Sequence, residues 1–206
     1  MYPTVVSFYT RNSPYQLQAH HLVASCEKFG IPHCIEGVNS WGSWELNCAF
    51  KPFFIIEKMK QLRKPLLWVD VDAIFLRRPR LLKVFSHDFA AYTDPELPSD
   101  HPSKVRAGTL YINHTQGGRD FLMQWAIECQ RQLADSARQE EFWDQMALRD
   151  TLLGSSCKVG TLPVSYIHIL GHPGDEAKDA KPVIVHLQAS RREKRGDPCE
   201  KSSGQK

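Results

Sequence analysis

The order of apolar segments predicts an α/β fold in which helices flank a Rossmann-like, mainly parallel central sheet. Thr4–Tyr9 is a β-branched and aromatic run, which is typical of a buried strand. Apolar residues then recur at helical spacing from Tyr15 to Phe29, Gly30 follows, and His33–Val38 reads as a second strand. A strand, a helix and a strand in this order form a β-α-β unit, which favours parallel pairing.

The rest of the chain continues this alternation without an internal repeat or a domain linker. Helices are expected from Lys51 to Leu62, from Phe121 to Leu133 and around Phe142–Met146, and strands over 66–76, 89–93, 105–113 and 182–187. The polar segment 39–47 and the proline-containing segment 95–102 are expected to be loops.

Length and composition limit the class of protein. A chain of 206 residues suits one domain, here assigned to residues 1–191, followed by a basic tail over 192–206 that we expect to be disordered. The net charge of +3 is too small to indicate a nucleic-acid protein, and no aromatic residues interleave with the basic tail.

The six cysteines show no CxxC pair, which predicts reduced thiols and a cytoplasmic protein. No signal peptide is visible, and no apolar run approaches the ~20 residues that span a bilayer.

Two carboxylates interrupt the most apolar stretch of the sequence, LLWVDVDAIFL. Burying an ionised carboxylate is costly unless another group compensates its charge, so Asp70 and Asp72 need a partner. If the strand persists, the two side chains share one face, with Cα atoms about 6.6 Å apart. If the strand ends there, they lie at its carboxyl end, where open α/β sheets bind ligands. Either arrangement suits a hard divalent cation with oxygen ligands.

The ordered set of motifs resembles the nucleotide-diphospho-sugar transferases, which are glycosyltransferases of GT-A type with a DxD motif. The matching blocks run through most of the chain in the order of that family. They are Lys51-Pro52, Asp70-Val71-Asp72 with Arg77-Arg78-Pro79, the segment 107–113, Trp143-Asp144-Gln145 and His186. The resemblance implies a GT-A-like fold and transfer of a sugar from a nucleotide diphosphate, with a UDP-sugar as the expected donor.

The resemblance also implies a metal site for Mn²⁺ or Mg²⁺. Asp72 corresponds to the firmer metal ligand of the family motif, and Asp70 binds the metal directly, through water or through the ribose. His186 lies where the family has its C-terminal metal histidine, and a neutral imidazole is a suitable third ligand. Without the resemblance, a hydrogen-bonded core histidine is the commoner role for a single His.

The same resemblance implies roles for further residues. Asp144 and Gln145 would be the catalytic residues: Asp144 would bind hydroxyls of the donor sugar, and Gln145 would lie near the anomeric carbon. Such a pair is more typical of retaining enzymes. The family often has Asn at the place of Arg106, and it often has Lys near Arg191. The expected substrate-binding residues are Tyr9, Thr10, Lys51, Asp70, Val71, Arg106, Gly108 and Arg191.

The acceptor is open, because a glycan, a protein, a lipid head group and a modified nucleic acid all fit the sequence. Two other functions stay open as well. A phosphatase of the haloacid dehalogenase type would use Asp70 as nucleophile and the acidic segment 174–179 as a later motif, although a β-α-β-α run precedes Asp70. A transferase-like fold that binds a nucleotide sugar without turnover is the other alternative.

Overall fold

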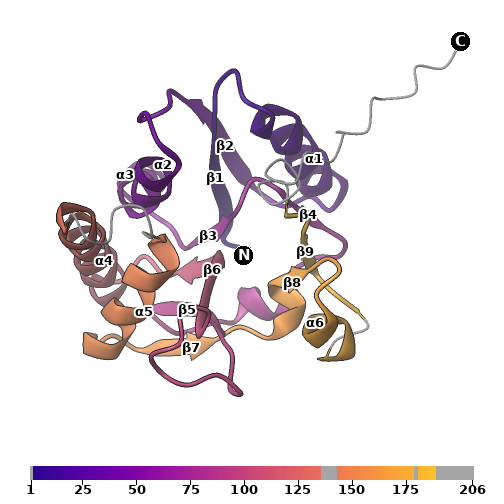
Figure 1. Ribbon diagram of the computed structural model, residues 1–206. Coiled ribbons are helices and arrows are strands. Elements are labelled where there is room, and N and C mark those ends of the chain that lie inside the picture. Colours follow the sequence, from indigo (N-terminus) through magenta and orange to yellow (C-terminus); the bar gives the residue numbers. More distant parts are fainter. Residues whose placement is uncertain (1, 136–142, 179–180, 189–206) are drawn as a thin grey trace, which may run out of the picture.

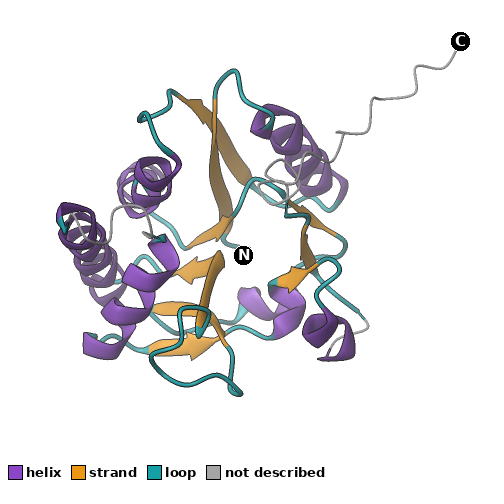
Figure 2. Ribbon diagram, in the orientation of Figure 1, coloured by secondary structure: helices purple, strands orange, loops and turns teal. Residues whose placement is uncertain are grey.

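The computed structural model describes residues 2–135, 143–178 and 181–188, which form two sheets with helices on both sides (Figures 1 and 2). A six-stranded sheet has the order β2-β1-β3-β6-β5-β7, and a three-stranded sheet has the order β4-β9-β8. The strands are β1 Thr4–Thr10, β2 His33–Val38, β3 Leu66–Val69, β4 Ala73–Phe75, β5 Phe89–Thr93, β6 Val105–Ile112, β7 Val159–Thr161, β8 His168–Ile169 and β9 Ile184–His186.

Helices and the small sheet cover the two faces of the large sheet, so its central strands β1, β3, β5 and β6 are largely buried on both sides. In Figure 1, α3 (Lys51–Leu62), α4 (Gln116–Ala134) and α5 (Asp144–Gly154) lie on one side of the sheet. On the other side are α1 (Tyr15–Lys28), the small sheet and α6 (Pro173–Lys178). The short elements are α2 (Trp44–Ala49), η1 (Arg80–Lys83) and η3 (Val164–Tyr166).

Neighbouring residues of one strand therefore belong to two different cores. Val6 and Trp68 pack in the core beneath α3, α4 and α5, whereas Val5 and Leu67 pack in the core beneath α1 and the small sheet. Side chains alternate between the two faces of a strand, and a sheet covered on both faces needs apolar residues at every position. This explains the continuous apolar runs in the sequence.

The predicted α/β class is confirmed, and the central sheet is mixed. Among the described strands, three of the five pairings in the large sheet are parallel, because β1 pairs with β2 and β3, and β5 with β7, in that direction. Strand β6 runs antiparallel to both β3 and β5. None of the described helices is both long and apolar enough to cross a membrane.

Two predicted boundaries are wrong. The segment 39–47 contains the start of α2, because the hydroxyl of Ser43 accepts a hydrogen bond from the Leu46 amide (3.2 Å) and caps the helix. The single strand expected over 66–76 is divided into β3 and β4, which belong to different sheets. The division falls at the two carboxylates.

Candidate active site

The chain turns at the two carboxylates as it leaves the large sheet. Strand β3 ends at Val69, the Asp70 amide donates to the Gly108 carbonyl (2.8 Å), and the Ala73 amide donates to the Asp70 carbonyl (3.0 Å). The strand therefore does not persist through the motif, and the second of the two expected arrangements holds. Both carboxylates lie just beyond the carboxyl end of a central strand, which is the usual ligand position in open α/β sheets.

A histidine from the other end of the chain joins the carboxylates. One potential ligand atom each from Asp70, Asp72 and His186 lies within 4.8 Å of the other two. Burial lowers the pKa of His186 to about 4, so the ring is neutral at physiological pH and keeps a free electron pair for a metal. Two carboxylate oxygens and an imidazole nitrogen form a donor set that fits a divalent cation such as Mn²⁺.

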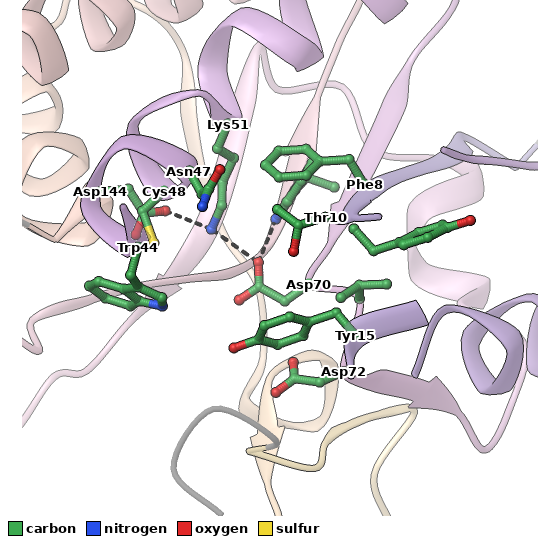
Figure 3. A pocket seen from close by; sticks show the side chains of 13 residues that line it. Phe8, Thr10, Tyr15, Trp44, Asn47, Cys48, Lys51, Asp70, Asp72 and Asp144 are labelled. Carbon is green, nitrogen blue, oxygen red and sulfur yellow. Dashed lines mark hydrogen bonds and ion pairs between the residues drawn. The ribbon is translucent and has the colours of Figure 1, made fainter. Parts of the chain in front are cut away.

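Lys51 is the charged partner of Asp70. Its ammonium lies 3.0 Å from Asp70 Oδ1 and 2.6 Å from Asp144 Oδ2, so it bridges α3, the turn after β3 and the start of α5 (Figure 3). The Trp68 indole donates to the same Asp70 oxygen (2.8 Å), and the Lys51 ammonium also lies over the Trp68 ring. These contacts fix the direction of the Asp70 carboxylate.

The charges of the Lys51 cluster, which consists of Lys51, Asp70 and Asp144, are unequal, because a single lysine pairs with two carboxylates. Burial alone would lower the pKa of Lys51, but Asp144 and Asp70 outweigh it and raise the pKa, so the ammonium stays charged. Burial raises the pKa of Asp144, and the nearby Asp70 adds to this effect while Lys51 opposes it. Burial also acts upward on the pKa of Asp70, yet Lys51 and His186 hold it below the ordinary value.

The cluster forms one wall of a cavity of about 200 Å³ (Figure 3). Seven residues expected at the site from the sequence line this cavity: Tyr9, Thr10, Lys51, Asp70, Val71, Asp72 and Asp144. Six further lining residues were not expected: Phe8, Tyr15, Trp44, Asn47, Cys48 and Trp68. Figure 3 shows the Tyr15 ring beside Asp70 and Asp72, and the Trp44 ring on the opposite side below Asp144.

A family model for nucleotide-diphospho-sugar transferases matches residues 53–196, which is more than half of the sequence. The chain belongs to the nucleotide-diphospho-sugar transferase family. It is therefore a glycosyltransferase that uses a nucleotide-sugar donor. No curated protein matches the sequence significantly.

Solved glycosyltransferase structures share the fold of this transferase. One is described as a glycosyltransferase involved in glycosylation of the major capsid of PBCV-1, with a TM-score of 0.69 and 13% identity over 95% of this chain and 97% of the other. The galactosyltransferase LgtC, solved with donor and acceptor sugar analogues, has a TM-score of 0.56 and 13% identity, with coverages of 90% and 87%. GlyE of Streptococcus pneumoniae TIGR4 has a TM-score of 0.58 and 16% identity, with coverages of 90% and 54%. These matches establish a GT-A-like fold.

Four residues expected at the site lie outside the cavity lining of the transferase: the metal-ligand candidate His186, the expected catalytic residue Gln145, and the expected substrate-binding residues Arg106 and Gly108. The Arg106 guanidinium makes two hydrogen bonds to Asp175 (2.6 and 2.8 Å), and the Gln145 amide donates to the Pro102 carbonyl (2.9 Å). At Gly108, the space that a Cβ atom would occupy is taken by the His186 ring. Arg191 and the basic tail fall outside the described residues.

The segment that resembled a phosphatase motif has another role. Asp175 lies in α6 with only 1% of its side chain exposed, and it accepts hydrogen bonds from Arg106 and from the Ile169 amide. It is not among the residues that line the cavity. The acidic segment 174–179 therefore contributes no described side chain to the Asp70 cavity, and the phosphatase alternative loses this support.

The missed residues had weak signals in the sequence. Tyr15 and Trp44 come from the first turns of α1 and α2, and both helices begin at the end of the sheet where β1 and β3 end. Trp44 lies in a segment that was expected to be a loop, so its place on a helix was hidden. The capping serine at position 43 was the signal that reveals this helix.

Proposed function

We propose that this transferase uses a divalent cation, Mn²⁺ or Mg²⁺, to transfer a sugar from a UDP-sugar with retention of configuration. The observation that carries the proposal is the grouping of Asp70, Asp72 and His186 within 4.8 Å, beside the Lys51–Asp144 ion pair. When bound, the cation supplies charge stabilisation for the departing diphosphate. Asp72 is the principal ligand in this proposal, with Asp70 and His186 completing the protein donors.

Lys51 and Asp144 position the donor sugar in this proposal. Lys51 holds the buried Asp144 carboxylate at the cavity wall, where carboxylate oxygens accept hydrogen bonds from sugar hydroxyls. Gln145, the next residue, acts near the anomeric carbon once its amide leaves the Pro102 carbonyl. The retaining outcome rests on the resemblance of this Asp-Gln pair to retaining enzymes of the family.

The nucleoside occupies the end of β1 in this proposal. Tyr9, Thr10 and Tyr15 line that part of the cavity, and aromatic rings beside hydroxyl groups suit a base and a ribose. The description of LgtC as a galactosyltransferase bound to donor and acceptor sugar analogues is consistent with a sugar-nucleotide site in this fold. The contacts of Arg106 point to a structural task, so we assign the donor contacts to the cavity residues.

A reducing compartment suits the thiols of this chain. The five cysteines within the described residues are all free, and burial raises the pKa of Cys26 to about 12. A raised pKa keeps a thiol protonated and unreactive. We therefore keep a cytoplasmic location as part of the proposal.

The proposal is tested by thermal unfolding with UDP, GDP, CMP and AMP, each with and without Mn²⁺. UDP with Mn²⁺ at about 100 times its Kd should add about 2.7 kcal/mol to the free energy of unfolding. Asp72→Asn should abolish this gain, whereas the control Asp120→Asn, at an exposed position on α4, should keep it. The absence of any nucleotide effect in the native protein would contradict the proposal.

Turnover is measured separately, by release of UDP from UDP-glucose and UDP-galactose in the presence of Mn²⁺. If the site is catalytic, we expect slow hydrolysis of these UDP-sugars that depends on Asp72 and Asp144. Binding of UDP with no hydrolysis or transfer of any donor would instead indicate a module that binds nucleotide sugars without turnover.

A further inference from the structure

A buried hydroxyl holds the ring of the third metal-ligand candidate. Thr109 Oγ1 lies 2.9 Å from His186 Nε2. Thr109 is 0% exposed and His186 is 5% exposed, so water does not compete for this hydrogen bond. Thr109 belongs to β6 and His186 to β9, so the contact joins the two sheets at the carboxylates.

The ring is also packed on its other side. A Cβ atom at Gly108 would lie 2.8 Å from His186 Cε1 and 3.1 Å from Nδ1, so only glycine leaves room for the imidazole there. The backbone is fixed as well, because the Leu170 amide donates to the His186 carbonyl (3.0 Å) and the Leu187 amide donates to the Asp72 carbonyl (2.8 Å). The position and the plane of the ring are therefore determined by the protein.

We propose that Thr109 is a positioning residue that selects which nitrogen of His186 binds the cation. In this proposal the hydroxyl accepts the proton of Nε2–H, which leaves the electron pair of Nδ1 available for the cation. This inference rests on the metal site of the proposed function. Metal-binding histidines generally use one nitrogen for the metal and donate the other N–H to a fixed acceptor, and loss of that acceptor reduces metal affinity by about 10- to 100-fold.

Loss of the hydroxyl changes the ring in a defined way. A buried N–H without an acceptor is unfavourable, so the proton moves to the nitrogen that finds a partner. Protonated Nδ1 has no electron pair for a metal, and the remaining ligands are then the two carboxylates. Valine has nearly the same shape as threonine, so Thr109→Val removes the hydrogen bond and preserves the packing.

The experiment compares three variants of the full-length protein. Thr109→Val removes the hydroxyl, and Thr109→Ser keeps it. Thr4→Val is the matched control, because Thr4 is a buried threonine of β1 whose hydroxyl has no hydrogen-bond partner among the described residues. Mn²⁺ affinity is measured by electron paramagnetic resonance with UDP present, and the His186 tautomer is measured by ¹⁵N NMR of the metal-free protein. Thermal unfolding confirms that each variant is folded.

We expect Thr109→Val to weaken Mn²⁺ binding by about 10- to 100-fold, and Thr109→Ser and Thr4→Val to bind within a factor of about three of native affinity. The native ring should carry its proton on Nε2, and only Thr109→Val should lose this tautomer. Native affinity in a folded Thr109→Val variant would overturn the inference, as would an Nδ1–H tautomer in the native protein. Failure of the native protein to bind Mn²⁺ in the presence of UDP would contradict the proposed function. The ¹⁵N NMR measurement of the tautomer would then still test the hydrogen bond between Thr109 and His186 separately.

Discussion

Two buried cations in this transferase have similar exposure and different surroundings. Lys51 and Arg106 have 8% and 10% of their side chains exposed, and each pairs with aspartates from distant segments. Lys51 makes one contact each to Asp70 and Asp144 at a cavity wall, and 37% of the Asp70 side chain is exposed. Arg106 makes a two-point contact with Asp175, which is almost fully buried, and its guanidinium stacks over the Tyr92 ring.

The pKa values of the aspartates reflect this difference. Burial acts to raise the pKa of Asp175, but the hydrogen bonds from Arg106 and from the Ile169 amide hold it below the ordinary value. Burial raises the pKa of Asp144 and the charge of Asp70 adds to this effect, so the pKa stays above the ordinary value although Lys51 lies 2.6 Å away and acts to lower it. Arg106 and Asp175 match each other in charge and geometry, whereas the Lys51 cluster has an excess of negative charge.

This difference separates a structural ion pair from the one that the proposed function places at the donor site. The Arg106–Asp175 pair joins β6 to α6, and Asp175 also binds the Ile169 amide of β8, so the pair holds the small sheet and α6 against the large sheet. The Lys51 cluster faces a cavity and is incompletely neutralised, which is the arrangement expected where a ligand brings additional charge.

The largest expected effect is on stability, from loss of the Arg106 side chain. Arg106→Ala should lower the free energy of unfolding by about 3–5 kcal/mol, because Asp175 is left buried without its partner. Urea denaturation measures this change. The control Arg131→Ala removes the ion pair of an exposed arginine with Glu128 and should change the stability far less. Equal effects of the two substitutions would contradict the structural role of Arg106.

The next effect is a pH dependence of stability that distinguishes His186, beside Asp70, from the Arg106–Asp175 pair. Burial lowers the pKa of His186 to about 4, from an ordinary value of 6.5. Between these values the unfolded chain binds a proton that the folded protein does not, so metal-free stability should fall by about 3 kcal/mol as the pH decreases from 6.5 to 4.

His186→Gln should remove this pH dependence. The contribution of Asp175, whose pKa is lowered, is instead lost below the ordinary carboxyl pKa of 3.8. Urea denaturation of both proteins at intervals from pH 7 to 4 measures the difference, and an unchanged slope in His186→Gln would refute the assignment.

The smallest of the three effects concerns Lys51. Lys51→Met should reduce sugar transfer or donor hydrolysis by about 100-fold, because a preorganised charge at the donor site is lost. It should destabilise the protein less than Arg106→Ala does, since Asp70 is partly exposed and can be solvated, and Asp144, whose pKa is already raised by burial, can take up a proton. Steady-state UDP release and urea denaturation measure the two quantities. A loss of stability as large as that of Arg106→Ala, without a loss of activity, would make Lys51 another structural cation.

The sequence predicted the parts of the site that depend on local pattern. An acidic pair within an apolar run located Asp70 and Asp72, and the resemblance to the family added His186, which the structure brings next to them. The helix that begins at Lys51 was also predicted correctly, because the apolar residues that follow recur at helical spacing.

The parts that were missed depend on contacts between distant segments. Nothing near Arg106 in the sequence indicates that Asp175, in another element, will bind its guanidinium, and the family resemblance assigned Arg106 to donor binding instead. The division of β3 from β4 was hidden for a similar reason, since it is fixed by the bond from the Asp70 amide to the Gly108 carbonyl and by pairing of Ala73 with His186. Local propensity contains no information about such partners.

The placement of His186 on β9 has a consequence for biosynthesis. Ribosomes make the chain from its N-terminus, so the acidic turn and the helix that carries Lys51 emerge long before the strand that supplies the imidazole. The turn with Asp70 and Asp72 is therefore made before its histidine partner, which reaches the carboxylates only when β9 inserts between β4 and β8. In the proposed function, the complete set of metal ligands forms only at that step.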